Sequence, residues 1–376
     1  DYPVQNVQER TMKVVTVLGT RPEIIKLSAL LPLLDLEFEH ILVHTGQHYD
    51  YNMDEVFFEH LKLKRPEYTL NVGSHQQGKQ TALMLERFEE VILTEKPDLV
   101  IVQGDTNTTL AGALAAVKLH IPVMHVEAGC RSFNRKMPEE INRIIADHVA
   151  DYLIAPDNKC ANHLKDEGIA AEKIMLLGST AFDAATRNKE LIDPSLIKKF
   201  CLEKDAFVLV TLHRAENTDN IESLRDIISA LNEIAKETTL VFPIHPRTKK
   251  IIAKNNLRIS KKIKVIEPQD YLSFLALLSA SKFCISDSGG IQEEALVFNV
   301  PCLMPREETE WMRLVEKGKN FLIGTNPERI ISSVRRLLGD EEELQRIKHI
   351  TVHYETAVSQ KIIQLIKSIA VRNGNS

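Results

Sequence analysis

The stretch Ser286-Asp287-Ser288-Gly289-Gly290-Ile291-Gln292-Glu293-Glu294-Ala295 decides how this chain folds, because it indicates a buried strand that gives way abruptly to a helix. Lys282-Phe283-Cys284-Ile285 before it is a short apolar run, and apolar residues at helical spacing continue after it to Phe298. Glycines at a helix N-terminus let an anion approach the free backbone amides, and the helix dipole adds favourable charge. The stretch therefore predicts a phosphate-sized anion site, although an ordinary helix start with a serine cap would have the same pattern.

The same alternation of short apolar runs with longer helical patterns extends along the whole chain. Strands are predicted at 13–18, 40–44, 99–103, 123–127, 152–155 and 174–177 in a first series, and at 207–212, 240–244, 263–266, 283–286, 302–304 and 321–323 in a second. Such alternation is typical of an α/β fold with parallel sheets built from strand-helix units. The polar segment 183–204 between the two series, broken by Asp193-Pro194, indicates a linker.

The length of 376 residues predicts two domains, because one domain usually has on the order of 150 residues. We expect an N-terminal domain of residues 12–183 plus 355–376 and a C-terminal domain of residues 184–354. The chain begins without Met, and Met12 opens the first predicted strand. Residues 1–11 are therefore interpreted as an addition that is foreign to the native fold.

Composition excludes several classes of function. With 44% hydrophobic and 26% charged residues and a net charge of -5, the sequence predicts a soluble globular protein without a basic face for nucleic acid. It has no apolar run of the roughly 20 residues that a membrane span requires. Five cysteines without a Cys-x-x-Cys pair indicate reduced thiols in the cytoplasm. No dinucleotide fingerprint, P-loop, nucleophile elbow or Cys/His cluster occurs, so we expect neither a cofactor nor a catalytic metal.

Three carboxylates, Asp105, Glu127 and Glu139, follow or adjoin predicted strands of the first half. Ligands of open parallel sheets bind at the carboxyl ends of the strands, which makes these acids candidates for proton transfer. Each also has a structural explanation. Asp105 could cap the next helix, Glu127 could be a strand-end charge in water, and Glu139 could simply favour a helix start after Pro138.

Basic, imidazole and amide groups stand at similar positions, close behind predicted strands. They are Arg21, Lys26, Gln47, His48, His213, Arg214 and His245. Taken singly, each of these residue types is more often structural than functional. Together they place polar groups behind predicted strands in both halves of the chain.

Six motifs occur in an order and at a spacing that are not generic. They are Gly19-Thr20-Arg21-Pro22-Glu23 with Lys26, Gly104-Asp105-Thr106, His125-Val126-Glu127-Ala128-Gly129, Pro138-Glu139-Glu140-Ile141-Asn142-Arg143, His213-Arg214 and Ser286-Asp287-Ser288-Gly289-Gly290. From about Lys13 to its last predicted helix, the chain resembles the non-hydrolysing UDP-N-acetylglucosamine 2-epimerases. This resemblance implies two Rossmann-like domains of GT-B type, an active site with UDP in the cleft between them, and a homodimer.

The resemblance also implies a reaction. Members of the family invert C2 of the sugar without a redox cofactor, by eliminating UDP to form a 2-acetamidoglucal and adding it back. UDP-N-acetylglucosamine is the expected substrate, and relatives that act on UDP-2,3-diacetamido-2,3-dideoxyglucuronate share features of this sequence, among them Arg131-Ser132-Phe133. A GT-B glycosyltransferase, a hydrolysing epimerase and a non-enzymatic UDP-sugar sensor are the competing interpretations.

Residue roles follow from the resemblance position by position. The catalytic positions are Asp105, Glu127, Glu139 and His213. The positions that bind the substrate or its UDP group are Arg21, Lys26, His213, Gln269, Phe274, Ser288, Gly289, Gly290, Glu294 and Arg306.

The chain departs from the family pattern at three places. Trp311 replaces a ligand-binding arginine, for which Arg306 or Arg313 is expected to compensate, and Ser179 replaces a common asparagine. Asp50 stands where members with an allosteric UDP-sugar site have a glutamine. This third departure argues against such a site, although other positions of it are matched. The matched positions are Gln47, His48, Arg214 and His245.

Overall fold

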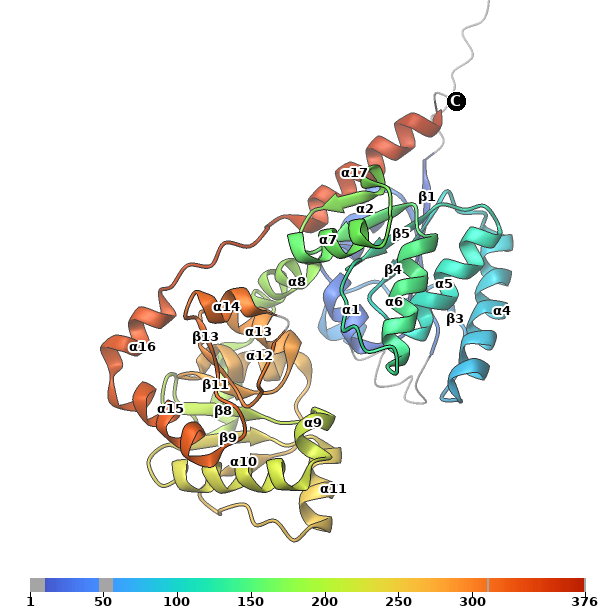
Figure 1. The fold of residues 1–376 in the computed structure, drawn as a ribbon. Coiled ribbons are helices and arrows are strands. Elements are labelled where there is room, and N and C mark those ends of the chain that lie inside the picture. The colour runs from blue at the N-terminus through green and yellow to red at the C-terminus, as the bar shows by residue number, and fades with distance from the viewer. Residues whose placement is uncertain (1–10, 47–56, 310, 375–376) are drawn as a thin grey trace, which may run out of the picture. The chain divides into compact units, whose positions relative to one another are not determined.

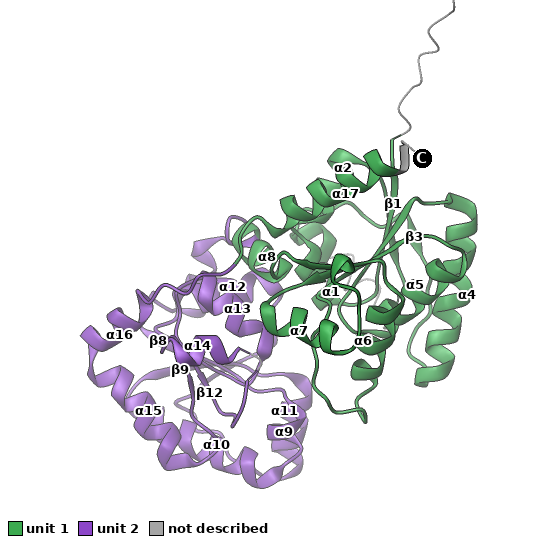
Figure 2. Ribbon diagram, turned by 45° about the horizontal axis from the view of Figure 1, so that its top comes forward, with its two compact units in different colours: residues 1–187, 355–376 green, residues 188–354 purple. Residues whose placement is uncertain are grey.

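The computed structural model describes residues 11–46, 57–309 and 311–374. The chain forms two compact units, which Figure 2 distinguishes by colour. Unit 1 comprises Asp1–Arg187 and Glu355–Ser376, and unit 2 comprises Asn188–Tyr354. Each unit contains one parallel β-sheet flanked by helices (Figure 1), so the predicted α/β class with two parallel sheets is confirmed.

The sheet of unit 1 has seven strands in the order β3-β2-β1-β4-β5-β6-β7. They are β1 Lys13–Leu18, β2 Glu39–His44, β3 Tyr68–Thr69, β4 Leu99–Gln103, β5 Val123–Val126, β6 Tyr152–Ala155 and β7 Ile174–Leu176. The six predicted strands all form with ends within one residue of the prediction. Sequence analysis missed only β3 among the described residues, because its two residues at the sheet edge are too few to give a pattern.

The described helices of unit 1 connect and flank these strands, and the C-terminal α17 packs against α2. They are α1 Arg21–Leu27, α2 Leu31–Glu37, α4 Gln77–Glu95, α5 Asn107–Lys118, α6 Pro138–Val149, α7 Asn158–Asp166, η1 Ala171–Lys173, α8 Thr180–Lys189 and α17 Val358–Gly374.

The sheet of unit 2 has six strands in the order β10-β9-β8-β11-β12-β13. They are β8 Phe207–Thr211, β9 Thr239–Pro243, β10 Lys264–Ile266, β11 Cys284–Ser286, β12 Cys302–Met304 and β13 Asn320–Leu322. The described helices of this unit are η2 Pro194–Phe200, α9 Ala215–Thr218, α10 Ile221–Ile234, α11 Pro246–Lys254, α12 Tyr271–Ala280, α13 Gly289–Val297, α14 Met312–Glu316, α15 Pro327–Gly339 and α16 Glu341–Lys348. Within the described ranges, no helix combines the length and apolar character needed to cross a membrane.

Strand β8 shows why the sheet of unit 2 is buried on both faces. Phe207 and Leu209 belong to one hydrophobic cluster, whereas Val208 and Val210 belong to another. Successive side chains of a strand point to opposite faces, so the two clusters lie on opposite sides of the sheet. An uninterrupted apolar run is the expected sequence of such a strand.

The segment 183–204, which we expected to be a linker, is largely helical. Helix α8 extends into it, and η2 follows within it. Asp193 caps η2 by accepting a hydrogen bond of 2.9 Å from the Ser195 N–H, and Pro194 occupies the first helical position. Proline needs no backbone donor there, so the Asp-Pro pair starts a helix instead of breaking one.

Lys319 is a fully buried lysine in unit 2, at the start of β13. Its Nζ donates hydrogen bonds of 3.2 Å to the Ile347 carbonyl and 2.7 Å to the Lys348 carbonyl, at the C-terminus of α16. Burial, with a smaller effect of the Lys348 charge, lowers the pKa of Lys319 to about 8. Lys319 therefore ties α16 to the sheet at the cost of burying an ammonium group.

This lowered pKa makes the stability of unit 2 depend on pH. The unfolded chain binds the Lys319 proton more tightly, so the contribution of this group is fully present above pH 10.5 and is lost as the pH falls to about 8. We expect the unfolding free energy of the wild type, relative to Lys319→Met, to rise by about 1.4 kcal/mol per pH unit in that window. Urea unfolding at several pH values measures the difference. Lys317→Met, at an exposed neighbouring position, is the control and should show no such slope.

Candidate active site

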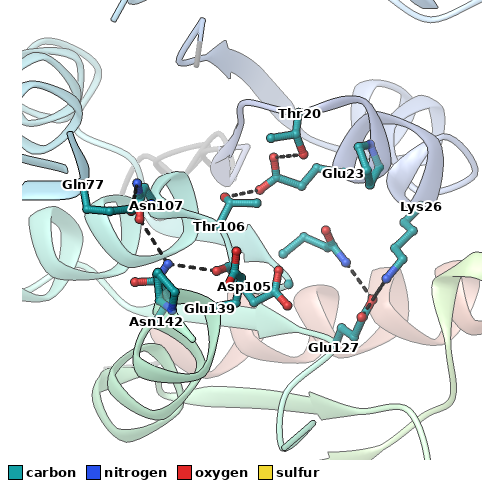
Figure 3. Close-up of a pocket in the computed structure, with 14 residues that line it drawn as sticks. Thr20, Glu23, Lys26, Gln77, Asp105, Thr106, Asn107, Glu127, Glu139 and Asn142 are labelled. Carbon is teal, nitrogen blue, oxygen red and sulfur yellow. Dashed lines mark hydrogen bonds and ion pairs between the residues drawn. The ribbon is translucent and has the colours of Figure 1, made fainter. Parts of the chain in front are cut away.

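A pocket of about 320 Å³ lies at the carboxyl ends of β4 and β5 in unit 1 (Figure 3). The loops after these strands and the first turns of α1, α5 and α6 supply its walls. The residues that line it are Thr20, Pro22, Glu23, Lys26, Gln77, Gln103, Gly104, Asp105, Thr106, Asn107, Glu127, Pro138, Glu139 and Asn142. The structure thus brings Asp105, Glu127, Glu139 and Lys26 together around one space.

Asp105 is held in the loop between β4 and α5 by contacts from α6. Its carboxylate forms an ion pair with Arg143, and its backbone carbonyl accepts a hydrogen bond of 2.9 Å from Asn142 Nδ2. Burial raises the pKa of Asp105 and the Glu127 charge adds to the effect, while Arg143 opposes it. Thr106, with Thr109, forms the capping box of α5, so the explanation of Asp105 as a helix cap is wrong.

Glu127 follows β5 directly and forms a bidentate contact with Lys26. Lys26 Nζ lies 2.7 Å from Oε1 and 2.6 Å from Oε2, and Gln103 Nε2 donates to Oε2 at 2.8 Å. The backbone of Glu127 has φ of 70°, in the left-handed region that costs a non-glycine residue about 1 to 3 kcal/mol. Its side chain is 25% exposed and paired, so Glu127 is not a solvated strand-end charge.

Glu139 and Glu140 open α6 side by side but have different surroundings. Glu139 is exposed at the pocket, and its carboxylate makes no hydrogen bond or ion pair within the described residues. Glu140 is buried and accepts hydrogen bonds from the N–H groups of Ser132 and Phe133, at 2.8 and 2.9 Å. Burial opposes ionisation of Glu140, but these bonds hold its pKa below the usual value. Glu140 therefore fixes the loop, and Glu139 remains available to a ligand.

Glu23, on α1, is a buried acid in the pocket wall. It accepts hydrogen bonds from the Gly19 N–H at 2.9 Å and from the Thr20 and Thr106 hydroxyls at 2.8 Å. Burial raises the pKa of Glu23 to about 7, against these hydrogen bonds and with a smaller contribution from the Asp105 charge. Glycine is required at position 19, because a Cβ there would overlap the Thr45 and Thr108 hydroxyls.

A chain of amide side chains supports Asp105 from the opposite side of the pocket. Asn107 Nδ2 donates to Gln77 Oε1 at 2.7 Å and to Gln80 Oε1 at 2.8 Å. Asn142 Nδ2 in turn lies 3.2 Å from Asn107 Oδ1 while it donates to the Asp105 carbonyl. Figure 3 shows Asn107 and Asn142 facing each other across the start of two helices. These contacts orient the Asn142 amide toward the Asp105 carbonyl and fix the position of the loop between β4 and α5.

In unit 2, the predicted anion site is the N-terminus of α13. Ser288 is the N-cap residue and makes no side-chain cap hydrogen bond, and its N–H donates to Ser286 Oγ at 3.1 Å. Gly289 and Gly290 begin the helix, and neither has a positive φ. A Cβ at Gly290 would meet no atom within 4 Å. The glycines therefore leave open space next to the helix N-terminus, which favours an anion.

Asp287 joins this helix start to the loop after β8. Its buried carboxylate accepts from the N–H of His213 at 3.1 Å, from the N–H of Arg214 at 3.1 Å and from Asn217 Nδ2 at 3.2 Å. The His213 ring, 43% exposed, has Nδ1 3.4 Å from Asp287 Oδ1. The His245 ring centroid lies 6.3 Å from that of His213. Asp287 therefore holds two predicted site residues, His213 and Arg214, beside the anion site.

The remaining predicted residues occupy separate positions in their own units. The Arg21 guanidinium lies over the Phe57 ring at 5.1 Å in unit 1. In unit 2, Gln269 precedes α12 and Phe274 lies on it, packed against the core. Glu294 lies on α13, and burial followed by the Glu294 charge raises the pKa of Tyr271. Gln47 and His48 lie outside the described residues.

Trp311, Arg306 and Arg313 have different surroundings in unit 2. Trp311 precedes α14, and its backbone N–H donates to Thr309 Oγ1 at 3.2 Å. Arg306 is buried, with Nε 3.9 Å from Glu216 Oε2, whereas Arg313 is exposed on α14. Arg306 thus contacts Glu216 on α9, the helix that begins directly after His213 and Arg214.

A family profile described as UDP-N-acetylglucosamine 2-epimerase matches residues 34–367. The chain belongs to this family. The UDP-N-acetylglucosamine 2-epimerase of Methanococcus maripaludis is 47% identical over 338 residues, which cover 87% of this chain and 92% of that protein. The UDP-2,3-diacetamido-2,3-dideoxy-D-glucuronate 2-epimerase of Pseudomonas aeruginosa is 44% identical over 333 residues, which cover 87% of this chain and 93% of that protein.

A solved structure of the family has the same fold. The crystal structure of the Methanocaldococcus jannaschii UDP-GlcNAc 2-epimerase in complex with UDP-GlcNAc and UDP matches with a TM-score of 0.82 and 44% sequence identity. The match covers 95% of this chain and 100% of that chain. The likeness therefore extends over most of both units.

Sequence reasoning missed two polar residues that organise the sites of this family member, Glu23 and Asp287. Both stand inside quoted motifs, Glu23 four residues after Gly19 and Asp287 immediately before Ser288. A carboxylate within a glycine-containing strand-to-helix turn was the available signal. Its role was not visible, because the donors of Glu23 include Thr106 and those of Asp287 include His213, which are distant in sequence.

The raised pKa of Glu23 predicts a pH-dependent stability. The folded protein holds the proton more tightly than the unfolded chain, so the contribution of Glu23 is fully present below pH 4.5 and is lost as the pH rises through about 7. We expect the wild type to lose about 1.4 kcal/mol per pH unit relative to Glu23→Gln in this window. Urea unfolding measures both proteins, with Glu86→Gln on the exposed side of α4 as control. A difference that stays constant with pH would contradict the prediction.

Proposed function

We propose that this protein interconverts UDP-N-acetylglucosamine and UDP-N-acetylmannosamine, for the synthesis of cell-surface polysaccharide precursors. The observation that carries the proposal is the meeting of Asp105, Glu127 and Glu139 around one pocket in a member of this epimerase family. A glycosyltransferase or a UDP-sugar sensor would give no reason for three carboxylates at this place. The proposed reaction requires no redox cofactor.

The proposed path breaks and remakes the bond between C1 of the sugar and UDP. UDP departs from C1 as a base removes the C2 proton, and the electron pair of the C–H bond forms the C1=C2 double bond of a 2-acetamidoglucal. UDP then adds back to C1, and an acid delivers a proton to the opposite face of C2. This sequence needs proton-transferring groups on two faces of the ring and a site that stabilises the departing pyrophosphate.

We assign the two faces to Glu127 and Asp105, which follow the adjacent strands β5 and β4. The Lys26 ammonium balances the charge of an ionised Glu127, which suits it to accept the C2 proton. Burial raises the pKa of Asp105, which suits it to hold and deliver a proton. In the reverse direction the two groups exchange roles. Glu139, exposed at the pocket, is proposed to accept hydrogen bonds from the sugar.

Unit 2 is proposed to hold the UDP group. The open N-terminus of α13 at Ser288, Gly289 and Gly290 suits a pyrophosphate, because free backbone N–H groups and the helix dipole both favour an anion. His213, positioned by Asp287, would add a donor next to that anion. Glu294 is proposed to bind the ribose hydroxyls, and Gln269 with Phe274 the uracil. Arg306 takes the place of the arginine that Trp311 replaces.

A second substrate, UDP-2,3-diacetamido-2,3-dideoxyglucuronate, is favoured by the Pseudomonas aeruginosa relative. Arg131, however, does not supply a contact for the uronate carboxylate. It is buried and bound to Asp147 and Glu167 by contacts of 2.7 Å. The Arg131-Ser132-Phe133 sequence therefore has a structural role, and we keep UDP-N-acetylglucosamine as the main proposal.

Location and assembly remain proposals of the same kind. All five cysteines are free thiols, and Cys130 and Cys160 remain unbonded with their sulfur atoms 3.3 Å apart. The cytoplasm is proposed from the sequence, whose five cysteines include no Cys-x-x-Cys pair. A homodimer is proposed from the resemblance to the family.

The proposed reaction is tested by incubating the protein in deuterated water with each of the two UDP-sugars. We expect deuterium at C2 and formation of the C2 epimer from UDP-N-acetylglucosamine, with slower conversion of the diacetamido uronate, followed by NMR. UDP release that requires an acceptor would indicate a glycosyltransferase, and net loss of UDP without acceptor a hydrolysing epimerase. Absence of exchange with both sugars would refute the proposal.

The assignment of faces predicts asymmetric exchange in single variants. Glu127→Gln should lose C2 exchange with one epimer, and Asp105→Asn should lose it with the other, while both variants lose net epimerisation by about 10² to 10⁴-fold. The remaining carboxylate can still remove and return a proton on its own face. UDP binding, measured by calorimetry, should stay unchanged because neither Glu127 nor Asp105 is among the residues proposed to bind UDP. Equal loss of exchange with both epimers in both variants would contradict the assignment.

A further inference from the structure

Behind the pocket of unit 1 lies a buried charged pair, His125 and Asp147, to which the motifs above give no role. Both side chains are fully buried, His125 on β5 and Asp147 on α6. His125 Nδ1 lies 2.7 Å from Asp147 Oδ1, and His125 Nε2 lies 2.8 Å from the Gly104 carbonyl oxygen. A carbonyl oxygen can only accept a hydrogen bond, and an ionised carboxylate also only accepts. Both ring nitrogens must therefore carry protons, which makes His125 an imidazolium.

The groups around the pair support this charge state. Burial lowers the pKa of His125, but the Asp147 carboxylate, the Gly104 carbonyl and the Glu127 charge together raise it above the usual value. Burial raises the pKa of Asp147, but His125 and Arg131 outweigh this and lower it. Arg131 Nη1 lies 2.7 Å from Asp147 Oδ2 and its far side pairs with Glu167. The cluster thus holds two cations and two anions.

This cluster contacts each of the three elements that carry the pocket carboxylates. His125 holds the Gly104 carbonyl, directly before Asp105. Asp147 Oδ2 accepts from the Gly129 N–H at 3.1 Å, two residues after Glu127, where the backbone has positive φ at Glu127 and again at Gly129. Asp147 itself belongs to α6, the helix that begins with Pro138 and Glu139 and carries Asn142 and Arg143.

At Gly129 the loop after Glu127 packs closely against α7. A Cβ at this position would collide with the backbone of Cys160, so the loop after Glu127 runs against the start of α7. The left-handed conformation of Glu127 is unfavourable for an L-residue and persists only when neighbouring contacts enforce it. The hydrogen bond from the Gly129 N–H to Asp147 is such a contact.

We propose that the His125 imidazolium and Asp147 are positioning residues, which fix Asp105, Glu127 and Glu139 in one geometry by joining β4, β5 and α6 through a buried ion pair. The pair does not touch the substrate. Its charge is the essential property, because a neutral imidazole has one N–H and would release either the Gly104 carbonyl or Asp147. This inference rests on the proposed function, since Asp105 and Glu127 are taken as the groups that transfer the C2 proton and Glu139 as a group that binds the sugar.

The deciding experiment compares Asp147→Asn with His125→Gln over a range of pH. In Asp147→Asn the buried imidazolium loses its anion, so its pKa falls and epimerisation should decline as the pH rises through the new value. We expect a loss in kcat of about 10²-fold at the alkaline end, where the neutral ring no longer joins the β4 loop to α6 through a buried ion pair, with KM little changed. His125→Gln has no titrating group, so its loss in kcat should be independent of pH. Both variants should bind UDP as the wild type does, through unit 2.

Matched controls separate positioning from general damage. His120→Asn changes an exposed histidine five residues before His125, and Asp166→Asn changes an exposed aspartate on α7. Both should retain the kcat and the pH profile of the wild type. Thermal unfolding and circular dichroism of each variant show whether its fold is intact. Folded Asp147→Asn and His125→Gln proteins with wild-type kcat would overturn the inference.

A measurement on the unaltered protein tests the charge state without any variant or any turnover. With nitrogen-labelled histidine, NMR should detect two protected N–H protons on the His125 ring, assigned by their proximity to the Gly104 backbone, and both should persist above the pH at which an ordinary histidine loses its proton. A ring with a single N–H at neutral pH would overturn the inference even if the variants do not fold. If the wild type exchanges C2 protons on neither sugar, the proposed function fails, while this measurement still decides the state of the buried pair.

Discussion

Crowded negative charge at the carboxyl ends of β1, β4 and β5 is the constraint on which the rest of unit 1 depends. Glu23, Asp105 and Glu127 stand around one pocket, and burial there makes an uncompensated carboxylate costly. Each acid is compensated differently. Glu23 takes three neutral donors and has a pKa of about 7, Asp105 is paired with Arg143, and Glu127 is paired with Lys26. The same sheet edge therefore presents carboxylates in three different electrostatic environments, which suits the acid and base catalysis that we propose.

Unit 2 is proposed to bind an anion, the pyrophosphate of UDP, at the N-terminus of α13. Strand β11 is followed by a helix whose first residues are glycines, and the free N–H groups there favour an anion. Asp287 lies directly before Ser288, and its carboxylate accepts hydrogen bonds from the backbone N–H groups of His213 and Arg214. A carboxylate next to a proposed phosphate site is tolerable because its oxygens are already occupied by three donors. Both units thus use carboxylates to hold loops, and in unit 1 other carboxylates line the pocket proposed for proton transfer.

The strands and the motif residues were predictable because their signals are local. A buried parallel strand such as β8 has an unbroken apolar run, and Gly104-Asp105-Thr106 stands immediately behind such a run. Where one residue has two local explanations, sequence could not choose between them. Asp193-Pro194 can either end or start a helix, and in the structure it starts η2. Either Asp105 or Thr106 can cap α5, and in the structure the cap is Thr106. Likewise the sequence showed only that Arg131-Ser132-Phe133 is shared with certain relatives, and the structure shows that Arg131 pairs with Asp147 and Glu167.

By itself, the sequence determined the α/β class, the position of almost every strand and the family to which the chain belongs, because these depend on hydrophobic periodicity and on short motifs of adjacent residues. Only the tertiary structure decided which charges neutralise one another. Lys26 is 101 residues from Glu127, Thr106 is 83 from Glu23, and His125 is 22 from Asp147. The strength of an electrostatic interaction depends on the distance between charges in space and on their burial, neither of which is written in the order of the residues.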